Sequence, residues 1–475
     1  MIAGILFIFS SHCTAPSESV VAIVGTTIIH PECEGSAVVE SNCTMILSDG
    51  RIQSMGPSKT MKIPKGAKAI QGRGKWVIPG LIDSHVHFFQ SGNLYTRPDV
   101  LNLTEWVPYA QEVARNKARL PATFKVWLAN GVTGVADMGG PYWNFEVRKA
   151  ANQSQAAPRV AAAGPLISTV ERKLLDLGDP PIIQVASPEA ARALAEKELK
   201  YKPDFIKAWF IYKPGDNLVA KESIMKAAGG VARRAGLPFA VHATELVTAK
   251  AALHAGADIL VHSVGDQPVD DEFLALARKN KAVYIPTLAS WSCVVSALLN
   301  RWKPTPVEQL RADPQILSVM NALEKIPKSD LETLERPLRK LLPPPVIDAL
   351  EKNAPIPSPT VASKNLRAVW DAGITVAMGT DAGNPGILHG PSVFREMEFM
   401  AEAGLTSLEV LRSATVNAAK VMGRNDMGTI APGRLADLVL LNADPLENVK
   451  NMSKIALVIK GGTVFDPEAL LNSIR

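Results

Sequence analysis

The sequence predicts an α/β protein, a (β/α)8 TIM barrel with a small β-sandwich domain formed by both chain termini. Its 475 residues suffice for one large barrel and a satellite domain. The middle of the chain repeats short apolar strands followed by Ala/Leu/Glu/Lys-rich helical segments, whereas both ends show only short β-segments. Because neither end has enough strands to be stable alone, we expect the two ends to fold together.

Residues 1–19 are predicted to be a signal segment. The run MIAGILFIFSSHC is too short to span a membrane but fits the apolar region of a signal peptide. A basic region before it is missing, and Ser10-Ser11-His12 is a poor lipoprotein motif in front of Cys13. A signal would predict a periplasmic or extracytoplasmic protein, with Cys13 as a candidate lipid anchor. The alternative is a frayed apolar N-terminus on a cytoplasmic protein.

Residues 20–76 and 425–475 are predicted to be the two parts of the β-sandwich. The first contains VVAIVGTTII and MILSDGRIQSMG, the second ADLVLLN and KIALVIKGGTVFD, which are apolar runs broken by turn residues. Cys33 and Cys43 flank a segment in the first part that could turn back as a hairpin. In an oxidising compartment they could pair, and in the cytosol they would stay free.

Residues 77–424 are predicted to form the barrel. Eight apolar runs supply its strands, in the order WVIPGLIDSH, GVTGVADM, RVAAAGPL, DFIKAWFI, PFAVHA, ADILVHSV, AVYIPTL and ITVAMGTD. Eight βα units in series favour a closed parallel barrel. The stretch 291–360 is helical, rich in proline and too long for an ordinary barrel loop. We interpret it as an insertion between strands seven and eight, a lid on the catalytic rim.

Composition and charge exclude several functions. The formal charge of +5 is small, and no Lys/Arg cluster is interleaved with aromatic residues, which argues against nucleic-acid binding. The sequence has no Cys-x-x-Cys pair and hence no zinc ribbon. It has no apolar run long enough for a transmembrane helix. The composition is that of an ordinary globular protein, and the sequence leaves its oligomeric state open.

His85 and His87 end the first barrel strand, two residues apart. Side chains two apart on a strand point the same way, so both imidazoles can bind one cation at the mouth of the barrel. An isolated His-x-His is a weak signal, but His242 and His262 also fall at predicted strand ends, out of only eight histidines. Asp381 ends the eighth strand, where a buried carboxylate among imidazoles favours a metal.

Lys207 ends the fourth strand between apolar neighbours. A lone ammonium facing inward would be costly to bury. Alternatively, the Lys207 side chain extends to the rim of the barrel and places its ammonium group in solvent.

Together these residues resemble those of the amidohydrolase superfamily, most closely its imidazolonepropionase-like and Xaa-Pro-dipeptidase-like branch. The resemblance covers most of the chain from about residue 20 and is weakest around 291–360. The matching segments are VIPGLIDSHVHF, GVTGVADMGG, DFIKAW, VHATE, GADILVHS, GTDAGNP, HGPSVFREMEFMAEAGLTSLEVLRSATVNAAKVMG and GTIAPGRLADLVLLNADPL.

The resemblance implies a centre of two divalent metals, with Lys207 carboxylated by CO2 to bridge them. His85, His87 and Asp381 would hold the first metal and His242 and His262 the second. Zinc suits these ligands best, although manganese, cobalt or iron could occupy the same site. A metal-activated hydroxide would attack the substrate, with Asp381 as general base and then general acid.

Glu245 leaves a mononuclear alternative open. It lies where mononuclear imidazolonepropionases carry a catalytic acidic residue. A single metal on His85, His87, His242 and Asp381 would then be assisted by Glu245. Otherwise Glu245 is a carboxylate that stabilises a helix N-terminus.

Tyr212 and His389 are predicted substrate contacts. Tyr212 follows the fourth strand and could donate a hydrogen bond to the developing oxyanion. His389 matches a family position near the site and could orient Asp381 or contact the substrate. Either could equally pack a loop. The segment after strand three, AAGPLISTVERK, lacks a histidine that some relatives carry, which weakens any transfer of dipeptidase specificity.

The preferred function is hydrolysis of a carbon–nitrogen amide bond in a linear or cyclic amide, a dipeptide or an N-acyl amino acid. Alternatively, the same metal site hydrolyses a lactone or a phosphoester, or catalyses a deamination. The presence of Lys207 argues against deamination. A non-catalytic barrel should lack some of the ligands, and none of the six is missing.

Overall fold

The computed structural model describes residues 20–213, 215–327, 330–331, 342, 344–352, 354 and 360–475. The predicted signal segment 1–19, with Cys13, lies outside the described residues. Within the described part of the chain, every helix is too short or too polar to span a bilayer.

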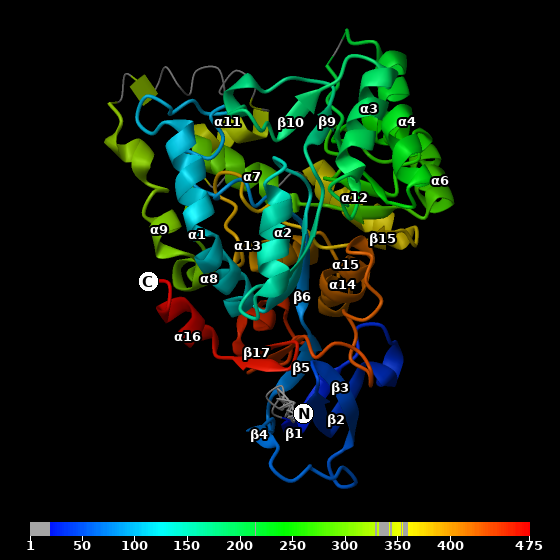
Figure 1. Ribbon diagram of the computed structural model, residues 1–475, viewed down its shortest axis with the longest axis vertical. Coiled ribbons are helices and arrows are strands. Elements are labelled where there is room, and N and C mark those ends of the chain that lie inside the picture. The colour runs from blue at the N-terminus through cyan, green and yellow to red at the C-terminus, as the bar shows by residue number, and fades with distance from the viewer. Residues whose placement is uncertain are drawn as a thin grey trace, which may run out of the picture.

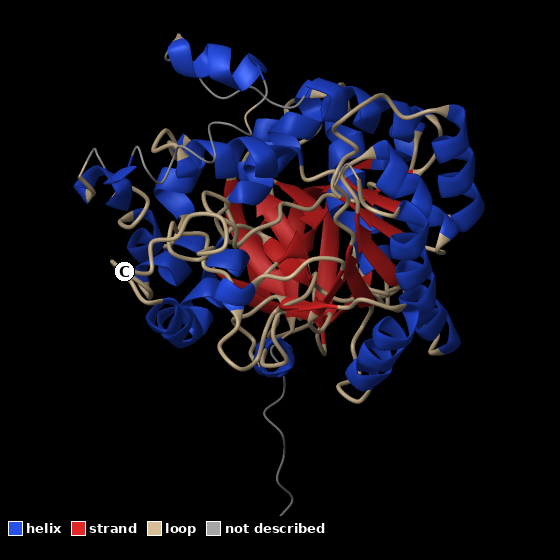
Figure 2. Ribbon diagram, turned by 90° about the horizontal axis from the view of Figure 1, so that it is seen from above, coloured by secondary structure: helices blue, strands red, loops and turns tan. Residues whose placement is uncertain are grey.

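All eight predicted barrel strands coincide with parallel strands. Their hydrogen bonds group them into a three-stranded sheet, β6-β7-β8, and a seven-stranded sheet, β10-β9-β11-β12-β13-β14-β15. Figure 2 shows these strands at the centre of the molecule with helices around them. The strands are β6 (Leu81–Val86), β7 (Val132–Asp137), β8 (Arg159–Ala162), β9 (Leu166–Ser168), β10 (Ile182–Gln184), β11 (Ile206–Trp209), β12 (Phe239–His242), β13 (Ile259–Val261), β14 (Val283–Ile285) and β15 (Thr375–Val376).

The predicted third strand runs through both sheets. β8 pairs with β7, and after Gly164-Pro165 the chain continues as β9, which pairs with β11. β10 was not predicted, since a run of three strand residues is too short to show a period. The first and last strands are also joined, because the amide of Ser84 donates to the carbonyl of Met378 at 2.9 Å.

The strands are buried on both faces because successive side chains point to opposite cores. On β13, Ile259 and Val261 belong to an inner apolar cluster that includes Ile82, whereas Leu260 belongs to the outer cluster beneath the helices. This alternation is the packing expected of parallel strands surrounded by helices.

Helices follow most of the strands. They comprise α1 (Tyr109–Ala129), α2 (Asn144–Gln153), α3 (Pro188–Leu199), α4 (Leu218–Arg234), α5 (Leu246–His254), α6 (Asp271–Asn280), α7 (Leu288–Leu298), α8 (Pro306–Arg311), α9 (Pro314–Leu317), α11 (Pro344–Glu351), α12 (Thr360–Asp371), α13 (Ser392–Glu402), α14 (Ser407–Arg412), α15 (Ala418–Val421) and α16 (Pro467–Asn472). The described part of the predicted 291–360 insertion is largely helical and lies between β14 and β15.

The two chain ends form one mixed sheet. Strand β16 pairs antiparallel with β5, and β5 pairs with β1, so the C-terminal hairpin completes the N-terminal strands (Figure 1). The order is β18-β17-β16-β5-β1-β2-β3, with β4 beside β1. The members are β1 (Val21–Ile29), β2 (Val39–Ser48), β3 (Arg51–Pro57), β4 (Lys68–Gln71), β5 (Trp76–Pro79), β16 (Leu438–Leu441), β17 (Ile455–Lys460) and β18 (Thr463–Phe465).

This sheet differs from the predicted two-layer sandwich, because hydrogen bonds connect all its strands. At the far edge of the sheet, Arg51 of β3 forms an isolated antiparallel β-bridge with Leu435, which lies just before β16. The strands share a hydrophobic core of their own. The predicted boundary at residue 76 falls at the start of β5, which belongs to this sheet, so the barrel begins after Gly80. Cys33 and Cys43 are both free thiols.

A buried ion pair joins this sheet to the barrel. Arg159 at the start of β8 donates to both carboxylate oxygens of Asp437, at 2.7 and 3.2 Å, and the amide of Gly461 also donates to Asp437 at 2.7 Å. The Asp437 side chain is 2% exposed. Removing Asp437 therefore leaves the Arg159 guanidinium, which is 22% exposed, and the Gly461 amide without their shared acceptor.

We expect Asp437→Ala to lower the free energy of unfolding by about 3 kcal/mol. Urea denaturation followed by circular dichroism measures it, with Glu447→Ala, an exposed carboxylate in the same region, as the control. A loss no greater than that of the control would show that this ion pair does not hold the two parts together.

Candidate active site

His85 and His87 lie side by side where β6 ends, as the strand alternation predicts. Their Nε2 atoms are 3.2 Å apart. Nδ1 of His87 lies 2.8 Å from the carbonyl oxygen of Gly139. Because a carbonyl can only accept, His87 donates from Nδ1 and keeps a lone pair on Nε2. Both rings therefore direct Nε2 to the same point.

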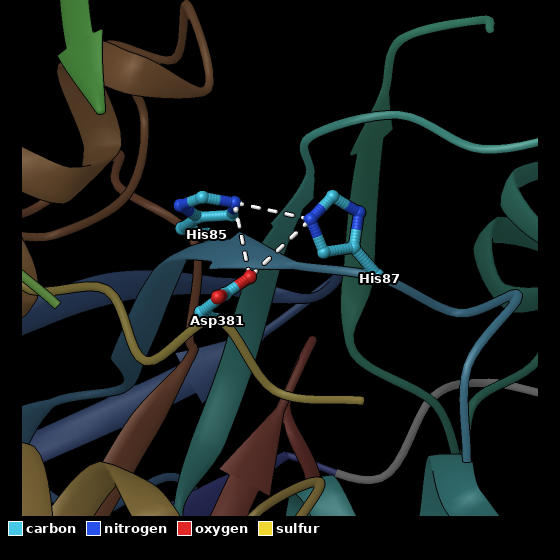
Figure 3. Close-up of side chains that lie close together, drawn as sticks. All are labelled: His85, His87 and Asp381. Atoms are coloured by element: carbon cyan, nitrogen blue, oxygen red, sulfur yellow. Dashed lines mark hydrogen bonds and ion pairs between the residues drawn. The ribbon is translucent and has the colours of Figure 1, made fainter. Parts of the chain in front are cut away.

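Asp381 joins the two imidazoles from the segment after β15 (Figure 3). Its Oδ1 is 3.4 Å from Nε2 of His85 and 3.3 Å from Nε2 of His87. Two glycines allow this approach: a Cβ on Gly379 would lie 2.9 Å from Cβ of His85, and one on Gly383 would lie 2.4 Å from the carbonyl oxygen of His87. The amide of Asp381 in turn donates to the carbonyl of His85 at 2.8 Å.

These three side chains could hold a metal ion. Their donor atoms are 3.2 to 3.4 Å apart, the separation expected of atoms that each lie about 2.0–2.2 Å from a common cation. All three residues are buried. A carboxylate and two imidazoles gathered in a buried site favour a bound cation.

His262, His242 and Lys207 complete the cluster from neighbouring strands. The ring centroid of His262 is 4.9 Å from that of His85 and 4.5 Å from that of His242. Lys207 is 1% exposed, and its Nζ has no hydrogen-bond partner among the described residues. It does not extend to the rim, so the solvent-exposed alternative for Lys207 is wrong. All six predicted ligands border one cavity.

The protonation states suit a metal site. Burial lowers the pKa of His85, His242 and His262, and neighbouring basic groups lower it further. Burial alone would raise the pKa of Asp381, but the close contacts with His87 and His262 and the hydrogen bond from Ser290 hold it below its ordinary value. Burial lowers the pKa of Lys207 to about 7. Neutral imidazoles and an ionised carboxylate are the forms that bind cations.

Backbone strain gathers at the same place. His262, Thr287 and Asp381 all have left-handed backbones, with φ of 73°, 44° and 67°. Such conformations in residues other than glycine cost energy and concentrate at functional sites. Two hydroxyls support the ligands here: Oγ1 of Thr287 lies 2.6 Å from Nδ1 of His262, and Ser290 donates to Oδ2 of Asp381 at 2.9 Å.

The cavity above the ligands has a volume of about 790 Å³. Phe89, Trp209 and Trp291 give it an aromatic wall, and Arg97 adds a cation. Residues of the predicted insertion also line it, among them Val294 and Val346, so part of that segment borders the cavity.

Glu245 lines the cavity, but its carboxylate is engaged. It immediately precedes α5, and its Oε2 accepts a hydrogen bond from the Thr248 hydroxyl at 2.9 Å. This arrangement fits the alternative in which Glu245 stabilises a helix N-terminus, while its place on the cavity wall leaves it within reach of a substrate.

Tyr212 and His389 do not border this cavity in the described structure. Tyr212 is half-buried beyond β11, where Trp209 occupies the wall. His389 lies behind the site, its Nε2 3.3 Å from the carbonyl oxygen of His87, between Phe88 and Trp127. Its contacts with the backbone of His87 and of Ala382, next to Asp381, fit a role in orienting these residues, whereas it lies outside the lining of the cavity that a substrate would enter.

Sequence reasoning missed several residues at the cavity. Arg97 donates to both oxygens of Asp99, at 2.7 and 2.8 Å, and to Oδ1 of Asn384 at 2.7 Å. Arg172 also contacts Asp99, at 3.2 Å, and lies over the ring of Trp209. These residues lie in loops, where no strand periodicity marks them. The one signal in the sequence is the run TRPD at residues 96–99, which follows the His-x-His motif and contains Arg97 and Asp99.

The chain matches a known family over most of its length. The amidohydrolase family model matches residues 76–276 and 317–465, which is well over half of the chain. The chain belongs to the amidohydrolase family. The resemblance predicted from the sequence is therefore confirmed, and with it a hydrolase that acts on carbon–nitrogen bonds.

Individual relatives agree with this membership. The imidazolonepropionase of Deinococcus deserti is 25% identical over 409 residues, 85% of this chain and 86% of its own length. The ochratoxinase of Aspergillus niger is 37% identical over 100 residues, 20% of each chain. A solved Xaa-Pro dipeptidase with bound methionine has a TM-score of 0.67 at 22% identity, covering 94% of this chain and all of its own. The last is a likeness of fold, and it supports a barrel domain with a second domain for this amidohydrolase.

Proposed function

We propose that this amidohydrolase cleaves a carbon–nitrogen amide bond in a small molecule, using divalent metal ions held by His85, His87, Lys207, His242, His262 and Asp381. The observation that carries the proposal is the convergence of these side chains on one cavity: they come from the ends of β6, β12 and β13, from within β11 and from the segment after β15. When bound, such cations lower the pKa of a water molecule and polarise the scissile carbonyl.

Asp381 is the group that moves the proton. Oδ1 faces the two imidazoles, while Oδ2 accepts from Ser290, so the carboxylate is fixed in orientation. Held ionised by its neighbours, it can take a proton from the attacking water and deliver it to the leaving nitrogen.

A two-metal centre is supported by the state of Lys207. Its Nζ is buried without a partner among the described residues, and its pKa of about 7 leaves much of the amine neutral at neutral pH. A neutral amine is the form that reacts with CO2, and the resulting carbamate would supply an anion between the metals. The one-metal alternative uses His85, His87, His242 and Asp381, with Glu245 assisting.

Closure of the (β/α)8 barrel is part of the same proposal. The pairing of β8 with β7 and of β9 with β11 supports it at one junction, and the hydrogen bond from Ser84 to Met378 at the other. In a closed barrel these strand ends share one mouth, which accounts for a site built from residues far apart in the sequence.

The cavity favours an amide that carries apolar or aromatic groups together with a carboxylate. Trp209, Trp291 and Phe89 offer ring faces and edges for stacking. Arg97 lines the cavity and shares a single carboxylate, Asp99, with Arg172 behind it, so this side of the cavity keeps a surplus positive charge, while Glu245 and Asp266 place carboxylates elsewhere on the lining. N-acyl amino acids and dipeptides combine both features.

The test is a screen of N-acyl amino acids, Xaa-Pro dipeptides and cyclic amides, beside lactones, phosphoesters and amidines, with added zinc, manganese or cobalt. We expect hydrolysis of at least one class, strongest for members with a free carboxylate, and its loss on chelation. Turnover confined to lactones, phosphoesters or amidines would contradict amide hydrolysis. Absence of turnover in a metal-loaded enzyme against every class would contradict the proposed function.

A further inference from the structure

Helix α7 supports the ligands through its first turn. Thr287, the residue before the helix, contacts His262, and Ser290, in the first turn, donates to Asp381. These contacts reach ligands from two different strand ends. A shift of the helix start would therefore disturb both ligands at once.

The start of α7 has an unusual cap. A threonine before a helix normally caps it by accepting from an amide of the first turn. The Thr287 hydroxyl contacts His262, and it makes no capping hydrogen bond. The helix amides at this end need another acceptor.

Glu396 on helix α13 supplies that acceptor. Its Oε1 accepts from the amide of Leu288 at 2.8 Å and its Oε2 from the amide of Ala289 at 2.7 Å. Glu396 is fully buried. Leu288 and Ala289 lie between Thr287 and Ser290. The Glu396 carboxyl group therefore binds the short segment that carries the Thr287 and Ser290 hydroxyls.

Helix α13 is itself fixed in place. Arg395, next to Glu396, forms an ion pair with the buried Glu308 on α8. Ser392, one turn earlier, donates to Glu308 at 3.2 Å and accepts from the amide of Leu388 at 2.8 Å. Glu396 thus acts from a rigid support.

A carboxyl group at this position is costly. Burial raises the pKa of Glu396 to about 8 in spite of the two amide donors. An apolar side chain would avoid that cost but would leave two helix amides without an acceptor. The double hydrogen bond is therefore the interaction that explains a glutamate here.

We propose, on the basis of the metal site proposed above, that Glu396 is a positioning residue that holds the start of α7 so that Thr287 and Ser290 orient His262 and Asp381 for metal binding. It touches neither metal nor substrate. Its effect reaches the site only through the two hydroxyls.

The test compares Glu396→Gln with Glu402→Gln, an exposed glutamate at the end of the same helix. Metal affinity is measured by zinc competition with a chelating dye, beside kcat/KM and thermal unfolding. Gln keeps one acceptor and places an amide donor against the other N–H group. We expect about tenfold weaker zinc binding in Glu396→Gln, as for other residues that orient metal ligands, and no change in Glu402→Gln.

A second background separates positioning from general stability. In Thr287→Val/Ser290→Ala both hydroxyl contacts are gone, so Glu396→Gln should there change zinc affinity by less than about twofold. The full tenfold loss in that background would overturn the proposal, as would unchanged affinity in Glu396→Gln alone. Should that variant not fold, Glu396→Asp replaces it, with weaker zinc binding expected because the shorter side chain withdraws from the amides. If the wild-type enzyme itself binds no zinc, the proposed metal site fails instead.

Discussion

Asn in place of Asp381 should lower kcat/KM for amide hydrolysis by about a thousandfold or more. Asn preserves the shape and the hydrogen bond from Ser290, but it cannot take up a proton and is a weaker ligand beside His85 and His87. The measurement is steady-state kinetics on the best substrate of the screen, with zinc in excess.

Asp444→Asn, a half-buried aspartate in the terminal domain, is the matched control and should keep full activity. Thermal unfolding establishes that both variants are folded. A folded Asp381→Asn enzyme within about tenfold of wild type would exclude Asp381 as the proton carrier.

Lys207→Ala should lower activity by at least about a hundredfold and remove one of two bound metal equivalents. The change deletes the buried amine that lies among the imidazoles, and with it the bridging anion that carboxylation would supply. Because the change leaves a space, millimolar formate or acetate should restore part of the activity. Elemental analysis and kinetics measure the two effects.

Lys226→Ala, an exposed lysine on α4, is the control. If wild type and Lys207→Ala both hold a single metal with similar activity, the two-metal centre is wrong. Glu245→Gln should then be the more damaging substitution, as the one-metal alternative requires.

The proposed metal ligands could be grouped from the sequence because most of them are tied to a strand end, with Lys207, the second residue of β11, as the exception. Strand alternation places His85 beside His87, and parallel strands carry their carboxyl ends to one face, so His242 and His262 follow from position alone. Glycine at positions 379 and 383 marked the close approach that brings Asp381 inward.

Residues outside the strands could not be predicted in the same way. Thr287, Ser290 and Glu396 are ordinary in type, and their roles depend on how α7 packs on α13. Tyr212 was assigned from its position after a strand and His389 from resemblance, but the path of a loop decides where such side chains point. The terminal sheet was predicted as a sandwich because apolar alternation shows which face is buried but not which strands pair.

Metal bound at the strand ends is the central claim, and elemental analysis of the purified enzyme tests it most directly. Wild-type protein and the double variant His85→Asn/His87→Asn are dialysed against zinc, freed of excess ion and analysed by mass spectrometry, with circular dichroism to establish folding. We expect two equivalents of zinc in the wild type, or one in the mononuclear alternative, and loss of at least one in the double variant together with loss of hydrolysis. Wild-type protein without metal, or a double variant that keeps the full complement and its activity, would contradict a metal centre at these residues.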